Sequence, residues 1–167
     1  MPELSAYGLT VDPPSGWEGR IFRRVESGEL RAAEVSGPPA PVGELTFAVV
    51  HVATIPIPVD MADYGSDVVS ELGPDDALVV LKEFEPASAS QPLFASPGMP
   101  SRLDPGAFDP ATLQRRLDGQ AGYQAFFNEA GRAFCLYVVL GSYDRRVTTV
   151  ERVNDVLSTM SIDAGTQ

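Results

Sequence analysis

Two side chains could carry acid–base or nucleophilic chemistry, the single histidine His51 and the single cysteine Cys135. A histidine can act as a general base near neutral pH, and a partly exposed cysteine thiolate can act as a nucleophile. Both residues lie within apolar stretches, residues 48–53 and 133–141, which are typical of buried strands. We therefore favour structural roles for both. One histidine and one cysteine also cannot complete a four-ligand zinc site.

Paired carboxylates occur at two places, Asp75 with Asp76 and Glu83 with Glu85. Such pairs can hold a hard cation or share acid and base roles, and Glu83 and Glu85 would share one face of a strand. Acidic side chains also flank many strands because strand ends meet solvent, and we favour that explanation. The chain has no glycine-rich phosphate-binding pattern and no Gly-x-Ser-x-Gly motif. The sequence therefore predicts no enzymatic activity, no metal and no cofactor.

Two adjacent basic pairs stand out in this acidic chain, Arg115 with Arg116 and Arg145 with Arg146. Arginine pairs can receive a carboxylate or an acidic partner segment. They can equally balance nearby acidic charge. Arg145 and Arg146 lie just before the expected C-terminal helix, so we include them among the candidate contacts with a partner.

Residues 86–107 form the strongest candidate for a binding surface. The segment is rich in proline, serine, glycine and alanine, and Leu93, Phe94 and Met99 are scattered through it. Structureless loops of this length are uncommon in compact domains, and exposed apolar side chains on them often become ordered on a partner. Alternatively, Leu93 and Phe94 fold back onto the sheet. Trp17 follows a turn with two prolines and a glycine and is a second candidate contact. The residues expected to bind a partner are Trp17, Leu93, Phe94, Met99, Arg145 and Arg146.

Length and charge set further limits. The 167 residues suit a single domain covering residues 1–167. The net charge of −11 argues against nucleic acid and anionic lipid as partners, since both require clustered basic residues. We find no leader and no apolar anchor, and we expect a cytoplasmic protein with no membrane contact.

Apolar patterning predicts the elements that would position these residues. Residues 133–141 are apolar in both alternating sets, which predicts the central strand of a sheet covered on both sides. A turn at residues 128–131, with Gly131 at a positive-φ position, joins it to the preceding strand in a hairpin. The other expected strands are residues 4–11 at an edge, 19–25, 30–35, 45–55, 77–84 and 120–127, with a loop at 37–43.

Three helices are expected between and after these strands. Residues 63–72 show a four-residue apolar spacing, and Asp109 followed by proline suggests a cap for a helix at residues 110–117. Thr148 and Glu151 match a capping box for a last helix that ends near Ser161. The predicted fold class is α+β, an antiparallel β-sheet with helices on both faces.

The order of elements resembles the PsbP-like superfamily along nearly the whole chain. The matching features are residues 9–11 leading into Pro14-Ser15-Gly16-Trp17, the run of antiparallel strands, and the terminal helix with residues 153–160. The only local motif is the Pro-x-Gly-Trp turn. The resemblance implies an α/β/α sandwich that binds other proteins rather than catalysing a reaction, and it supplies no catalytic residue. The chain lacks the leader and lipobox cysteine of the lipoprotein members.

The sequence therefore predicts a non-enzymatic protein-binding or accessory domain, one component of a larger assembly. The alternative is a small-molecule or lipid-binding module. That module would need an apolar pocket between sheet and helices, lined by residues such as Phe47, Phe84 and Phe126.

Overall fold

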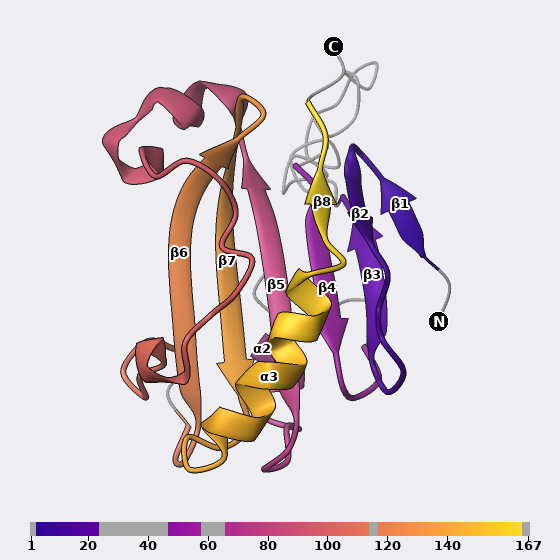
Figure 1. Ribbon diagram of the computed structural model, residues 1–167, viewed down its shortest axis with the longest axis vertical. Coiled ribbons are helices and arrows are strands. Elements are labelled where there is room, and N and C mark those ends of the chain that lie inside the picture. Colours follow the sequence, from indigo (N-terminus) through magenta and orange to yellow (C-terminus); the bar gives the residue numbers. More distant parts are fainter. Residues whose placement is uncertain (1–2, 24–46, 58–65, 114–116, 165–167) are drawn as a thin grey trace, which may run out of the picture.

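The computed structural model describes residues 3–23, 47–57, 66–113 and 117–164 of the chain. These residues form two antiparallel sheets and one long helix (Figure 1). The larger sheet contains, in spatial order, β3 (Glu18–Phe22), β4 (Val49–Ala53), β5 (Ala77–Phe84), β7 (Arg132–Leu140) and β6 (Ala121–Glu129). The smaller sheet contains β1 (Leu4–Ala6), β2 (Leu9–Val11) and β8 (Ser161–Ile162). The helices are α2 (Ser66–Val69), α3 (Arg146–Leu157) and the 3-10 helices η1 (Pro86–Ser90), η2 (Pro92–Phe94) and η3 (Pro105–Ala107).

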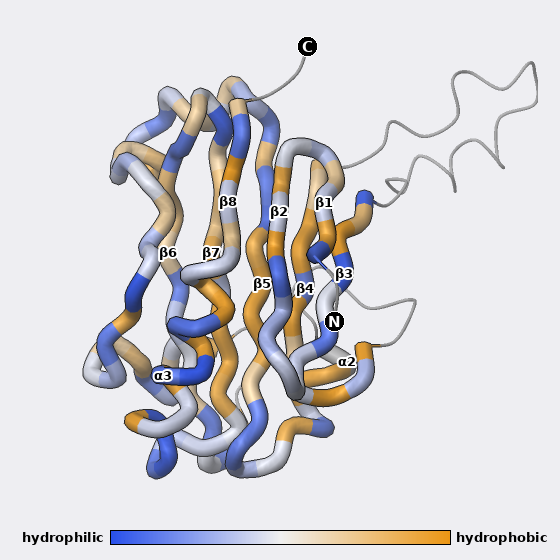
Figure 2. Tube along the Cα trace, turned by 45° about the vertical axis from the view of Figure 1, so that its right-hand side comes forward, coloured by the Kyte–Doolittle hydropathy of each residue, from blue (hydrophilic) through white to orange (hydrophobic). Residues whose placement is uncertain are grey.

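The strands β4, β5 and β7 form the hydrophobic interior of the larger sheet (Figure 2). All nine residues of β7 are buried, as the two-sided apolar pattern predicts. The strand is interior but not central, because the hairpin partner β6 lies outside it and β5 occupies the middle position. The prediction that residues 133–141 form the central strand is therefore wrong, because β7 lies next to the central strand β5. The expected strand at residues 77–84 matches β5.

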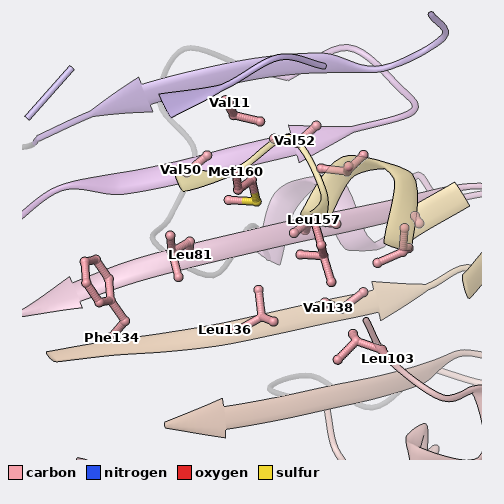
Figure 3. Close-up of a cluster of buried hydrophobic side chains, with 14 of the residues drawn as sticks. Val11, Val50, Val52, Leu81, Leu103, Phe134, Leu136, Val138, Leu157 and Met160 are labelled. Carbon is pink, nitrogen blue, oxygen red and sulfur yellow. The ribbon is translucent and has the colours of Figure 1, made fainter. Parts of the chain in front are cut away.

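Each face of the larger sheet has its own apolar cluster, which explains why these strands lack polar alternation. On the first face, Leu81, Leu136 and Val138 pack with Leu157 of α3 and with Val11 of the smaller sheet (Figure 3). On the second face the cluster contains residues from β4, β5 and β7 together with the apolar residues of α2. These are Val49, Ala53, Leu78, Val80, Cys135, Tyr137, Val139, Val68 and Val69.

The C-terminal helix α3 does not begin at the predicted capping box. Arg145 occupies the N-cap position without a side-chain cap, and Thr148 lies inside the helix. Instead, the hydroxyl of Thr149 donates a hydrogen bond to the carbonyl oxygen of Arg145 at 3.0 Å. The helix ends at Leu157, before the predicted end, because the chain then turns into β8, which pairs with β2.

The other two predicted helices are only partly covered by the described residues, and there they are shorter or replaced by a turn. The expected helix at residues 63–72 is described only as α2, four residues long. Residues 110–113 form a turn instead of a helix. The side chain of Asp109 closes this turn, because its Oδ1 atom accepts from the backbone N–H of Ala111 at 2.7 Å. The carbonyl oxygen of Asp109 accepts from the backbone N–H of Thr112 at 3.0 Å. The α+β class is supported, but helices on both faces are not shown. No helix among the described ranges is both long and apolar enough to cross a membrane.

The N-terminal residues 4–11 form a hairpin in the smaller sheet, not a single edge strand of the larger one. Its turn places Tyr7 at φ 55° and Gly8 at φ 74°, the paired left-handed geometry of a two-residue hairpin turn. The β6–β7 hairpin uses the same geometry at Ala130 and Gly131, as predicted for Gly131. The expected strands at 19–25 and 45–55 are present as β3 and β4. The expected strand 30–35 and loop 37–43 lie outside the described residues.

Arg132, the first residue of β7, connects the two sheets. Its side chain is buried, and its Nε and Nη2 atoms donate to the two carboxylate oxygens of Glu83 at 2.8 and 2.9 Å. Its remaining N–H groups donate to the carbonyl oxygens of Tyr7, Gly8 and Asp163. A guanidinium group has five N–H donors, so each donor of Arg132 has an acceptor. One side chain thus joins β5 and β7 to the β1–β2 turn and to the end of β8.

Replacing Arg132 by methionine should lower the free energy of unfolding by about 3–5 kcal/mol. The substitution would leave the largely buried Glu83 carboxylate without its arginine partner, and breaking one side of a buried ion pair costs about that much. Equilibrium urea unfolding measures the change. Arg145→Ala is the matched control, because its ion pair with Asp75 is largely exposed and should contribute no more than about 1 kcal/mol. Equal losses in the two variants would contradict this account.

Candidate functional site

A long segment, which we call the strap (residues 86–109), runs along and across the outer strand β6. In Figure 1 it passes over the end of β6 and then down in front of β6 and β7, beside α3. It begins with η1 and η2 and continues through η3. It is therefore an ordered part of the fold with three 3-10 helices.

The first attachment of the strap is at Asn128 in β6. The backbone N–H of Asn128 donates to Ser96 at 2.9 Å, and its carbonyl accepts from Gly98 at 2.7 Å. Its side-chain amide donates to the carbonyl oxygen of Phe94. Next to it, Glu129 Oε1 accepts from the backbone N–H of Met99 at 2.9 Å. These bonds hold the strap against the hairpin end of β6.

The second attachment joins the strap to helix α3. The buried side chain of Asn154 accepts from the backbone N–H of Leu103 at 2.7 Å and donates to the carbonyl oxygen of Leu103 at 3.0 Å. Leu103 itself is buried in the first-face cluster. The asparagine thus satisfies both backbone groups of a residue whose side chain enters the core.

The third attachment carries the strap across the edge of β6. Asp109 and Gly122 exchange two backbone hydrogen bonds of 3.0 Å each. On the first face, Phe108 packs on the Tyr123 ring at 5.7 Å, and burial raises the pKa of the Tyr123 hydroxyl above its ordinary value. On the second face, the carbonyl of Thr112 lies where a Cβ of residue 122 would be, so this crossing requires glycine at position 122.

The two apolar side chains of η2 have different surroundings. Phe94 is buried against the rings of Phe84 and Phe126, with centroid distances of 5.3 and 5.6 Å. Leu93 points away and is 58% exposed. Of the two alternatives for this segment, folding back holds for Phe94 and exposure for Leu93. Met99 is half-buried and packs against the first-face cluster.

The other predicted contact residues do not lie beside the strap's exposed end. Trp17 is only 6% exposed and packs in the first-face cluster, with the Arg152 guanidinium 5.7 Å from its ring centroid. Arg145 pairs with Asp75 at 2.8 Å. Arg146 lies 4.0 Å from the Tyr143 ring centroid and donates to the Tyr143 carbonyl.

These residues do not form one contact surface. Leu93 lies in η2, which the strap's first attachment holds at the hairpin end of β6, where β7 begins. Arg145 and Arg146 follow the other end of β7. Trp17 is available only as a packing residue. The predicted pair Arg115 and Arg116 lies outside the described residues.

Most of the residues considered for acid–base, nucleophilic or metal-binding chemistry are buried or engaged in hydrogen bonds within the fold. His51 is fully buried, with its ring 5.0 Å from that of Phe22. Cys135 is buried and accepts a weak hydrogen bond from the Gln124 side chain at 3.7 Å. Asp76 accepts from Thr54 and from the backbone of Gly73, both at 2.8 Å. Glu83 is engaged by Arg132, and Glu85, beyond the end of β5, is exposed. Within the described residues, no three His, Cys, Asp or Glu side chains are placed to hold a metal ion.

Within the described residues, one hollow lies just beyond the end of the strap and another lies against the strap itself. One, of about 390 Å³, lies on the second face of the sheet and is lined by Ala111, Thr112, Leu113, Gln124 and Tyr137. The other, of about 310 Å³, is lined by four consecutive residues of the strap, Arg102, Leu103, Asp104 and Pro105. Neither is lined by the phenylalanines expected to form an apolar pocket.

Comparisons of the chain with protein-family models, with curated proteins and with solved structures find no match. The resemblance to the PsbP-like superfamily therefore remains a prediction.

The residues that attach the strap were not identified from the sequence. Asn154 did leave a signal, because it interrupts the apolar stripe of Val150, Val153 and Leu157 at a buried helical position. A polar side chain at such a position usually satisfies a buried backbone group. Asn128 and Gly122 gave no comparable signal, since turns and strand edges commonly contain both residue types.

Replacing Asn154 by alanine should detach the middle of the strap and lower the free energy of unfolding by about 2–3 kcal/mol, because two buried backbone groups lose their partners. Limited proteolysis should then cleave within residues 99–107. Asp155→Ala, at an exposed neighbouring position of α3, should leave cleavage unchanged. Cleavage that is the same in both variants would show that Asn154 does not hold the strap.

Replacing Gly122 by alanine should destabilise the protein by at least about 2 kcal/mol, because the added Cβ overlaps the Thr112 backbone and overpacking costs about this much. Gly106→Ala is the control, since there a Cβ meets only the Asp104 side chain at 3.2 Å. Thermal unfolding compares the two variants. A Gly122→Ala protein as stable as Gly106→Ala would contradict the crossing geometry.

Proposed function

We propose that this protein is a non-enzymatic binding or accessory domain and that the strap is its contact surface for another protein. The observation that carries the proposal is the pairing of Leu93 and Phe94 in η2. Phe94 is 3% exposed and fixes the turn to the sheet, while its neighbour Leu93 is 58% exposed. An apolar side chain held outward on a fixed turn is a suitable anchor for a partner's pocket.

The attachments of the strap favour binding for an energetic reason. A flexible loop loses conformational entropy when it binds, and that loss weakens the complex. Here, backbone hydrogen bonds from Asn128 and the side-chain bonds of Glu129 and Asn154 hold the strap before any partner arrives. The absence of a charged residue between Glu85 and Arg102 lowers the desolvation cost of covering this surface.

The alternative function, an apolar ligand pocket, receives less support from the packing. Phe84 and Phe126 were expected to line the pocket, but the Phe94 ring packs between strap and sheet against both of them. The PsbP-like α/β/α arrangement and a cytoplasmic location stay part of the proposal. The antiparallel sheet followed by helix α3, which precedes the short strand β8, supports that part of the proposal.

Replacing Leu93 by aspartate should abolish capture of a protein partner, because a charge replaces the apolar anchor. Thermal stability should not change, because the Leu93 side chain makes little contact with the fold. The measurement is affinity capture of tagged protein from the native lysate, followed by mass spectrometry. Val147→Asp is the matched control, since Val147 is 63% exposed but lies on α3.

The proposal requires a discrete partner that wild type and Val147→Asp retain and Leu93→Asp loses. A partner retained equally by all three proteins would place the contact elsewhere. Capture of no partner by the wild type would count against the protein-binding function itself.

A further inference from the structure

The strap covers the outer edge of β6 at two points and leaves a gap between them. Gly122 uses both its backbone N–H and its C=O to bond Asp109. Asn128 uses both of its backbone groups to bond Ser96 and Gly98. These two residues therefore direct their backbone groups away from β7 and toward the outer edge.

Between these points four backbone groups of the edge have no backbone partner among the residues that the structure describes. In an antiparallel ladder, alternate residues direct their N–H and C=O groups to the same side. The backbone N–H and C=O groups of Gln124 and Phe126 therefore point toward the outer edge, as those of Gly122 and Asn128 do. No backbone hydrogen bond joins either residue to another part of the described chain beyond its own hairpin. The gap spans residues 123–127, about 17 Å at roughly 3.4 Å per residue.

The hollow of about 390 Å³ lies beside this gap. Gln124 and its cross-strand neighbour Tyr137 line one side, and residues 111–113 line the other after the strap has crossed the edge at Gly122. Three of the five lining residues, Gln124, Thr112 and Tyr137, carry polar groups. A stretch of strand edge without backbone partners in the described chain and a hollow large enough to admit a side chain thus occur at the same position.

We infer that the edge of β6 between the two strap contacts binds a short extended peptide segment of a partner protein. Unpaired N–H and C=O groups on a strand edge are complementary to an extended backbone, which adds to the sheet as a further strand. Residues directly opposite each other in a ladder place their side chains on the same face. The peptide residue opposite Gln124 therefore enters the hollow, whose walls favour an uncharged polar side chain.

A second copy of this chain fits the edge less well than a free peptide. Two β6 strands related by a twofold axis at Ala125 would pair Gln124 with Phe126 of the other copy. Each copy's Gly122 would then face Asn128 of the other, where the two straps already occupy the edge. A peptide of three to five residues meets no such obstruction.

This inference deepens the proposed function by naming a partner chemistry, but it concerns a different surface from Leu93. The proposed function at Leu93 and the peptide-binding inference at β6 can therefore be contradicted independently. Loss of peptide binding in Leu93→Asp is not expected, and loss of lysate capture in a β6 variant is not required.

The test uses a displayed library of random heptapeptides selected on the full chain, and the enriched peptide is then titrated by calorimetry. Gln124→Pro removes the outward N–H at an edge position where proline is tolerated, and should weaken binding at least tenfold. Gln124→Ala keeps the N–H and loses only the side chain, so it should weaken binding less than threefold.

Amide hydrogen exchange on the wild type provides a second measurement that does not depend on the folding of the proline variant. The amides of Gln124 and Phe126 should exchange fast in the free protein and slowly with the peptide, while Ala125, bonded to β7, should not change. The inference is overturned if no peptide is enriched, or if these two amides are unaffected by the peptide. Slow exchange of both amides in a peptide-free dimer would also overturn it and assign the edge to a second copy.

Discussion

The guanidinium of Arg132 is the interaction on which the arrangement of the two sheets depends. It donates to the carboxylate of Glu83 in β5 and to carbonyl groups at both ends of the chain, in the β1–β2 turn and after β8. A buried charge is tolerated only when it is paired and its donors are satisfied. Because that requirement is met only when the smaller sheet lies over the larger one, Arg132 makes the position of the smaller sheet specific as well as favourable.

The strap has a different structural role, because it covers part of the outer edge of β6. Exposed strand edges invite unwanted pairing, and covering them with a loop is one of the ways in which proteins prevent it. Here the covering is held by Asn128, Asn154 and Asp109, and within the part of the chain that the structure describes it leaves the backbone groups of Gln124 and Phe126 uncovered. The same attachments orient Leu93 outward. Protection of the edge, the outward position of Leu93 and a short uncovered stretch of β6 are thus consequences of one set of hydrogen bonds.

Much of the larger sheet could be predicted because its signals are local and strong. The bounds of β5 and the turn at Gly131 follow from apolar runs and turn chemistry. The helix expected after Asp109 failed because the same side chain that can cap a helix also closes an isolated turn. The role of Arg132 had no local signal, since its acceptors include backbone carbonyls of Tyr7 and Asp163, which are far apart along the chain. Two of the residues predicted to contact a partner, Trp17 and Phe94, are instead buried in the fold, because large apolar side chains pack in the core as readily as they bind a partner.

Native-state hydrogen exchange of the wild-type protein tests most directly whether Arg132 joins the sheets into one unit. The amides of β2 would be compared with those of β5 and β7 under conditions that report the free energy of opening. If the arginine fixes the smaller sheet, the β2 amides should open with nearly the same free energy as the β5 and β7 amides, in one cooperative step. Opening of β2 at a much lower free energy, while the larger sheet remains protected, would contradict the account.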